Sequence, residues 1–225
     1  RERRRRVWQP DLAALRRRMA DLRDIGARFV RFWIPWSEVE KEEGRFDFSY
    51  VNDAIGTIAT TGLRLDITLC SLMVPSWFWV RHPDARPLNE RGEPVYKPSP
   101  TSVASASVSL WHPELRPRTE AFIHPAFSAC LDRWAPLILF LRVSMGRFNE
   151  PNYPDPKHFW CYDRWASADF RVKLEAKYGG DVSALNNAWG TAVGGFESVD
   201  VPRPARFKAL TPAHRADFIA WYRDA

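Results

Sequence analysis

The stretch that decides the fold is PLILFLRV, residues 136–143, an apolar run interrupted by one charged residue, Arg142. A short apolar run of this kind is typical of a buried strand in a parallel sheet. It is the clearest buried strand that the sequence predicts. Because Asn149 and Glu150 lie a few residues further on, the pattern places a carboxylate just beyond the carboxyl end of a strand.

The segments before this strand alternate between helical and strand patterns. Residues 12–26 carry apolar side chains three and four positions apart, and Asp11 can cap the helix that they predict. Residues 29–34 are a short apolar run, which indicates a strand. A second helix near residues 50–60 and a strand at residues 63–69 continue the order. Repeated alternation of this kind predicts an α/β fold, with a parallel sheet covered by helices.

The regular order is broken at two places. A Pro-rich and Trp-rich excursion at residues 75–117 is too long for an ordinary connection, and long loops of this kind usually carry function. Pro125 lies inside the helix expected at residues 119–134 and should kink or split it. In the last third we expect only helices, at residues 166–178, after Asp181 and after Thr211.

The aromatic content indicates a carbohydrate partner. The 225 residues include 11 Trp, and 14% of the chain is aromatic, which exceeds the need of an ordinary core of this size. Aromatic faces left over from packing stack well on the flat, apolar faces of sugar rings. Trp36 and Trp77 are the best candidates because each lies just past a predicted strand, with Trp33, Trp79 and Trp111 behind them. For any single Trp, packing in the core or a loop is the more frequent role.

The net charge of +6 raises the alternative of a nucleic-acid binder. Five of the excess arginines lie in residues 1–6, and three more lie at residues 16–18, whereas the rest of the chain is nearly balanced. We therefore interpret residues 1–10 as a basic N-terminal segment in solvent, and expect no nucleic-acid partner.

Cysteine usage and hydropathy set further expectations. Cys70, Cys130 and Cys161 are odd in number and widely spaced, so the sequence suggests no disulfide framework, no metal site and no cofactor. No apolar run approaches the roughly 18 residues of a membrane span, and the arginine run is not followed by a signal-peptide pattern. We expect a cytoplasmic protein without a membrane partner.

Glu150 is the candidate catalytic residue. Cleavage of a glycosidic bond needs one carboxylic acid to protonate the leaving oxygen, and a second group to attack the anomeric carbon or to activate water. Alone, a Glu after a strand is more often a solvated or ion-paired loop residue. Here Asn149 can hydrogen-bond a sugar hydroxyl, Tyr153 offers an aromatic face with a polar tip, and two prolines stiffen the loop. The set suits a preorganised site for a polyol.

These residues carry a resemblance to a known family. The Asn149-Glu150 pair resembles the acid/base signature that ends the fourth strand in clan A glycoside hydrolases, and within that clan the chain resembles the β-galactosidases of glycoside hydrolase family 42. Two further segments are similar to that family, at residues 36–48 and 170–191. The resemblance implies that residues 11–225 are part of a (β/α) TIM barrel with long βα loops. It also implies a retaining hydrolase that cleaves β-galactosides or related β-glycosides by double displacement.

The chain departs from the family pattern at three points. Cys161 lacks the neighbouring cysteines that bind zinc in many of the β-galactosidases, so we expect no zinc there. The run from Glu150 to Pro154 also resembles the β-amylase type of barrel, which makes a glucan hydrolase an alternative. The family's nucleophile is a Glu that ends the seventh strand, which we expect to lie beyond Ala225. We therefore interpret the chain as an incomplete N-terminal portion of the barrel, and expect no turnover from it alone.

Two secondary questions stay open in the sequence. Arg31, within the strand at residues 29–34, is either a residue that binds substrate at the barrel mouth or one half of an internal ion pair with Asp66. The rivals to an enzyme are a non-catalytic carbohydrate-binding barrel and a basic nucleic-acid binder.

Overall fold

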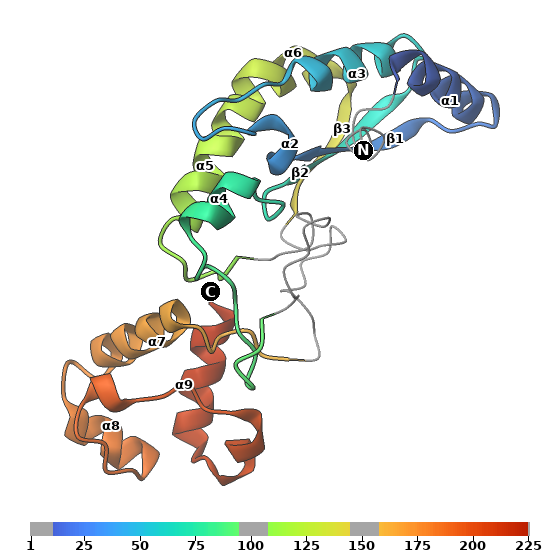
Figure 1. The fold of residues 1–225 in the computed structure, drawn as a ribbon. Helices are drawn as coiled ribbons and strands as arrows, with labels where there is room; N and C mark the ends of the chain where they lie inside the picture. The colour runs from blue at the N-terminus through green and yellow to red at the C-terminus, as the bar shows by residue number, and fades with distance from the viewer. Residues whose placement is uncertain (1–10, 95–107, 145–157, 225) are drawn as a thin grey trace. The chain divides into compact units, whose positions relative to one another are not determined.

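A computed structural model describes residues 11–94, 108–144 and 158–224. The chain divides into two compact units. Unit 1 comprises Arg1–Pro83, Pro98–Ala106 and Pro117–Asn152, and unit 2 comprises Asp84–Lys97, Ser107–Arg116 and Tyr153–Ala225. Each unit has its own elements (Figure 1). None of the described helices combines the length and the hydropathy that a transmembrane span requires.

Unit 1 is built on three parallel strands, as the alternating pattern predicts. The strands are β1 (Phe29–Pro35), β2 (Arg64–Cys70) and β3 (Ile138–Ser144), in the order β1-β2-β3. Residue pairs run in register along β1 and β2, whereas the pairing of β2 with β3 shifts between Leu65 and Asp66. A parallel sheet of this kind brings the carboxyl ends of all its strands to one edge.

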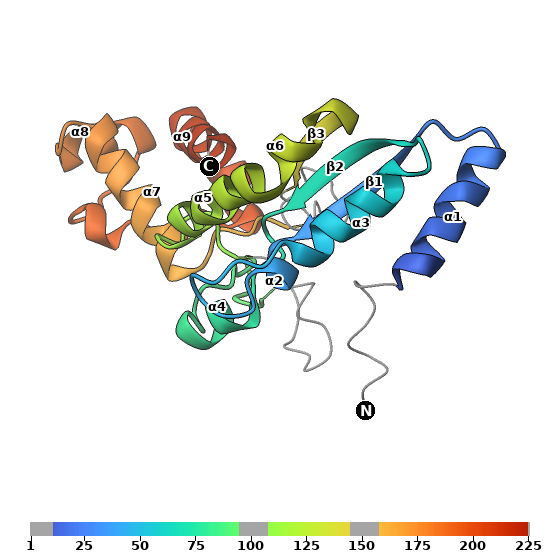
Figure 2. The same cartoon turned by 90° about the horizontal axis from the view of Figure 1, so that it is seen from above.

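Helices of unit 1 form a layer beside the sheet (Figures 1 and 2). Helix α1 packs against α3, and the Trp134 indole N–H donates to Asn52 Oδ1 at 2.9 Å, which joins α6 to α3. Asp11 caps α1 through a 3.1 Å bond from the Ala13 N–H. The helices are α1 (Leu12–Asp24), α2 (Trp36–Val39), α3 (Ser49–Ala59), α4 (Ser76–Arg81), α5 (Leu115–Ala126), of which the part from Pro117 belongs to unit 1, and α6 (Asp132–Trp134).

The predicted effect of Pro125 is confirmed. Helix α5 ends at Ala126, one residue after the proline, and Phe127–Leu131 forms a π-helical turn before α6. Proline has no N–H to donate to the preceding turn and its ring crowds the carbonyl there, so the regular helix cannot continue unchanged. The long helix of the sequence pattern is thus interrupted by a π-helical turn just after Pro125.

The predicted burial of the third strand is wrong, although the strand itself is confirmed. Leu139 and Phe140 on β3 are 42% and 51% exposed, whereas β2 is buried from Leu65 to Cys70. The reason is position: β2 has a neighbour on each side, and β3 is at an edge of the described sheet. Apolar composition predicts the strand, but not how much of it the described residues cover.

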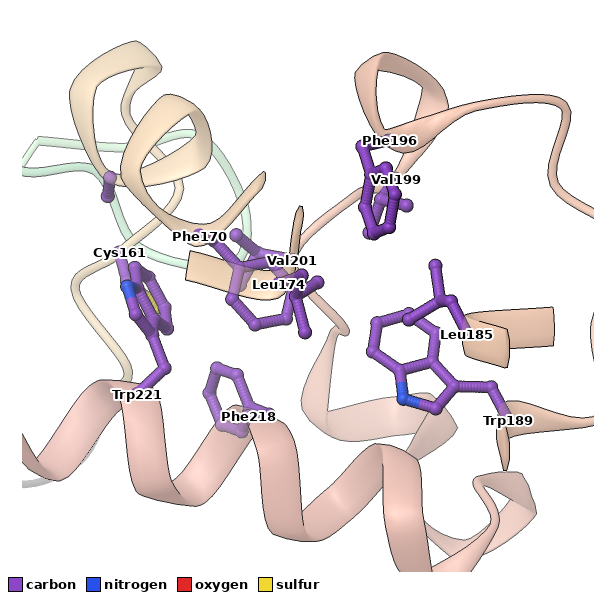
Figure 3. Packing of buried hydrophobic residues seen from close by; sticks show 11 residues of the cluster. Cys161, Phe170, Leu174, Leu185, Trp189, Phe196, Val199, Val201, Phe218 and Trp221 are labelled. Carbon is purple, nitrogen blue, oxygen red and sulfur yellow. The ribbon is translucent and has the colours of Figure 1, made fainter. Parts of the chain in front are cut away.

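Unit 2 is helical in its C-terminal part, as the sequence predicts. Helix α7 (Arg164–Lys177) ends before Gly179 and Gly180, which both have positive φ, and Asp181 caps α8 (Val182–Trp189). The 3-10 turns Phe196–Ser198 and Pro204–Ala209 precede α9 (Pro212–Arg223). Figure 3 shows Phe170 and Leu174 of α7 meeting Phe218 and Trp221 of α9, with Leu185 and Trp189 of α8 completing the buried cluster.

Candidate functional site

The proposed acid/base and two residues near it in the sequence lie outside the part of the chain that the structure describes. Asn149, Glu150 and Tyr153 fall in residues 145–157, which directly follow β3. The registers pair Pro35 with Cys70 and Cys70 with Ser144, so the three strands end level with one another. The carboxyl ends of the three strands therefore lie side by side, the arrangement from which barrel active sites are built.

One face of the sheet carries an ion-pair cluster that spans all three strands. Arg31 Nε donates to Asp66 Oδ2 at 3.1 Å, and Arg142 donates to both oxygens of Asp66, at 2.9 and 3.1 Å. The Asp66 side chain is 2% exposed, whereas the two arginines are 47% and 49% exposed. The sequence interpretation of an Arg31–Asp66 pair is confirmed. The sequence did not predict that Arg142 joins this pair, although a single charged residue in an apolar strand indicates that it has a buried partner.

The charge state of Asp66 follows from this geometry. Burial by itself would raise its pKa, but hydrogen bonds and charge from Arg142 and Arg31 outweigh burial and lower the pKa below its ordinary value. The cluster therefore keeps a carboxylate between two guanidinium groups, with one positive charge in excess. Excess positive charge on this face of the sheet favours carboxylates and hydroxyl oxygens as neighbours.

Replacing Asp66 with Asn is expected to destabilise unit 1 by about 1–3 kcal/mol at neutral pH, because two cations lose the anion between them. The value is below that of a fully buried pair, since both arginines are half-exposed. The measurement is urea unfolding beside Asp53→Asn, a change at an exposed position of α3.

Because the pKa of Asp66 is lowered, the stabilisation that it contributes is complete above the ordinary pKa range of Asp and is lost as the pH falls through the lowered pKa. A difference that persists in acid would contradict this assignment.

Trp36 does not offer a face to a sugar in the described structure, so the sequence prediction for it is corrected. Its side chain is fully buried, and its ring stacks on Phe122 at 5.9 Å and meets Trp77 edge-on at 6.3 Å. The indole N–H donates to the buried Glu40 carboxylate, which also accepts from the Gly44 N–H at 2.6 Å. Trp36 directly follows a strand, as predicted, but α5 covers its ring.

Trp77 is held in place from two sides. Its indole N–H donates to the Glu40 carbonyl at 3.1 Å, and the Arg118 guanidinium lies 5.7 Å from the ring centroid. Arg118 and Arg81 in turn each reach the Glu43 carboxylate at 2.8 Å. The ring remains partly exposed, so Trp77 stays a candidate for contact with a sugar.

Arg31 also lines a cavity of about 840 Å³ along β1. Trp33 and Tyr50 contribute aromatic surface to it, and Glu38 and Asp47 contribute carboxylates. Hydrogen bonds from Ser49 lower the pKa of Asp47, which therefore ionises more readily than an ordinary Asp. An aromatic wall beside charged acceptors and donors is the composition expected of a polyol site.

The cysteines offer no activated thiol in the described structure. All three are buried and free, and burial raises the pKa of Cys70 to about 12 and that of Cys130 to about 11. A thiol with so high a pKa is a poor nucleophile and a poor metal ligand at neutral pH. Within residues 11–94, 108–144 and 158–224, no group of three His, Cys, Asp or Glu side chains is placed to hold a metal ion.

Level ends of parallel strands, with helices beside the sheet, are the arrangement of TIM-barrel glycosidases. Two solved structures of that class match the chain. The β-galactosidase from the psychrophilic Marinomonas ef1 has a TM-score of 0.73 at 21% identity, over 96% of this chain and 32% of its own. The catalytic domain of the β-amylase from Paenibacillus polymyxa has a TM-score of 0.72 at 17% identity, over 97% of this chain and 57% of its own.

The chain belongs to glycoside hydrolase family 42, whose model, described as beta-galactosidase, matches residues 4–225. Among characterised relatives, the thermophilic beta-amylase of Thermoanaerobacterium thermosulfurigenes is 24% identical over 95% of the chain. Beta-galactosidase BbgII of Bifidobacterium bifidum is 24% identical over 83% of it. The chain spans 42% and 24% of the lengths of these two proteins.

Proposed function

We propose that this chain is part of a retaining glycoside hydrolase that acts on β-galactosides or related β-glycosides, with Glu150 as its general acid/base. The observation that carries the proposal is the Asn149-Glu150 pair following β3, in a member of this family whose strands end level. Residues 11–225 then belong to a (β/α)-barrel catalytic domain, and residues 1–10 are a basic segment ahead of it.

The proposed reaction is a double displacement. The Glu150 carboxylic acid gives its proton to the glycosidic oxygen while a carboxylate attacks the anomeric carbon, so the bond to the leaving group breaks as the covalent bond to the enzyme forms. The Glu150 carboxylate then takes a proton from water, which attacks the same carbon and releases the sugar and the nucleophile. In a retaining enzyme the two carboxyl groups lie about 5–5.5 Å apart. The nucleophile is not assigned to a residue of this chain.

Four other residues have proposed roles in binding. Asn149 and Tyr153 follow β3 with Glu150, and their amide and phenol groups suit sugar hydroxyls. The Arg31 guanidinium is half-exposed on the sheet face and keeps donors beyond the Nε–H that bonds Asp66. Trp77 would offer the partly exposed part of its ring. A neutral oligosaccharide or β-glycoside is the partner that this set favours.

A glucan hydrolase is the second candidate. It is supported by the beta-amylase relative, which matches 95% of the chain, and by the Glu150-Pro151-Asn152-Tyr153-Pro154 run. The full-length gene product should be assayed on an aryl β-galactoside, on lactose and on starch, with the anomer of the first product followed by proton NMR. We expect β-galactosides to be hydrolysed with the β-anomer formed first. Hydrolysis of starch alone would favour the second candidate, and sugar binding without turnover a non-catalytic barrel.

A further inference from the structure

Unit 2 contains a cavity of about 240 Å³ between α7 and α9. Two side-chain contacts bracket it. The Trp221 indole N–H donates to Asp169 Oδ2 at 2.7 Å, and Lys177 pairs with Asp217. Lys173 lies midway between Asp169 and Lys177 on the same face of α7. The methyl group of Ala220 is the only side chain that α9 places between its two contact residues on this face, and it is too small to close the gap.

The walls of this cavity combine an aromatic floor with charged groups at the rim. Trp111 is partly exposed and supplies the aromatic surface, stacked on Trp221 with ring centroids 4.8 Å apart. Trp221 and Phe170 are themselves buried, and they support it from α9 and α7 with ring centroids 4.7 Å apart (Figure 3). Lys173 and Asp224 supply a donor and an acceptor at the rim. Apolar rings beside alternating donors and acceptors match a pyranose, which has an apolar face and a polar edge.

Charge and size select among possible ligands. The lining contains three carboxylates, of Asp169, Asp217 and Asp224, against the ammonium groups of Lys173 and Lys177. The near-balance favours neither an anion nor a cation, and a neutral polyol uses both kinds of group. A volume of about 240 Å³ lies below the range of about 300–1,000 Å³ for sites of drug-sized ligands. The space suits one sugar ring and not an extended chain.

We propose that the α7–α9 cavity is a saccharide site that binds a single neutral pyranose, with Trp111 as its aromatic platform and Lys173 and Asp224 as hydroxyl partners. The inference rests on residues of unit 2 and does not depend on the proposed catalysis. It would hold a second sugar unit on the helical part of the protein.

The test is calorimetric titration of the full-length gene product with methyl β-galactoside and with maltose, using Ala220→Leu to fill the cavity. Ala216→Leu, an exposed change one turn earlier on α9, is the matched control. We expect Ala220→Leu to remove one binding event per chain, Ala216→Leu to remove none, and both to keep the parent's rate on an aryl β-galactoside. Lys173→Gln should lower the affinity of the same binding event by about tenfold. It provides a second test of the site if Ala220→Leu does not fold.

The outcomes separate this inference from the proposed catalysis. If the assignment of Glu150 is wrong but the α7–α9 site exists, the parent still binds one sugar ring at this site, and Ala220→Leu does not. If the α7–α9 site is the error, the parent, Ala220→Leu and Lys173→Gln bind sugar equally, or the parent shows no binding event beyond that of the catalytic site.

Discussion

Replacement of Glu150 with Gln in the full-length gene product is expected to lower kcat/KM for an aryl β-galactoside by about 10²- to 10⁴-fold. The amide keeps the size of the side chain, but its N–H protons are not acidic enough to transfer to the glycosidic oxygen, and it is too weak a base to take a proton from water later. The loss should be greatest for substrates whose leaving group is a poor one, since these need protonation most. The measurement is initial rates across aryl galactosides of graded leaving-group acidity.

Glu175→Gln is the matched control for this variant, because Glu175 is exposed on α7 and distant in sequence from the proposed site. It should retain the parent's rate on every substrate. A Glu150→Gln protein that matched the parent across the series would remove Glu150 from the chemistry.

Removal of the Asp217 carboxylate is expected to destabilise unit 2 by about 2–4 kcal/mol, because a buried indole N–H loses its acceptor, whereas the half-exposed Lys177 can return to water. This side chain is 1% exposed and accepts hydrogen bonds from three side chains: from Lys177 at the end of α7, from the Tyr178 hydroxyl at 2.7 Å, and from the Trp189 indole of α8 at 2.8 Å. Asp217→Ala would leave the indole N–H of Trp189, a member of the cluster in Figure 3, buried without an acceptor. Urea unfolding at neutral pH measures the effect.

The pH dependence of this contribution has a defined sign. Burial would raise the pKa of Asp217, but the hydrogen bonds from Lys177, Tyr178 and Trp189 outweigh it, so the pKa is lowered. The stabilisation is therefore present above the ordinary Asp range and disappears as the pH falls through the lowered pKa. Asp200→Ala, at a side chain that is 92% exposed, should change stability by less than about 0.5 kcal/mol. Equal stability of the two variants would refute the role of Asp217.

The elements of the fold could be predicted from local patterns because each depends on neighbouring residues. The apolar run at residues 136–143 indicated β3, the spacing at residues 12–26 indicated α1, and Pro125 indicated the irregular helix. Burial could not be predicted in the same way. It depends on which strands and helices lie alongside, and β2 is covered where β3 is not.

The contacts of the candidate site depend on register and on distant packing, so the sequence gives them only in part. Arg142 reaches Asp66 because the β2–β3 pairing shifts between Leu65 and Asp66, and nothing in the local pattern fixes such a shift. Trp36 is covered by Phe122 of α5, far along the chain. The Asp217 network joins three helices in the same way. The chemistry of Glu150 stays a prediction of sequence and family.

The central claim is that Glu150 serves as the acid/base of a double displacement, and trapping with azide tests it most directly. In Glu150→Ala, the covalent galactosyl intermediate formed from an activated aryl β-galactoside has no general base to activate water, whereas azide is already anionic and needs none. We predict that added azide restores turnover and that proton NMR identifies the product as β-galactosyl azide. Hydrolysis by Glu150→Ala at the parent's rate, with galactose as the product in the presence of azide, would contradict the account.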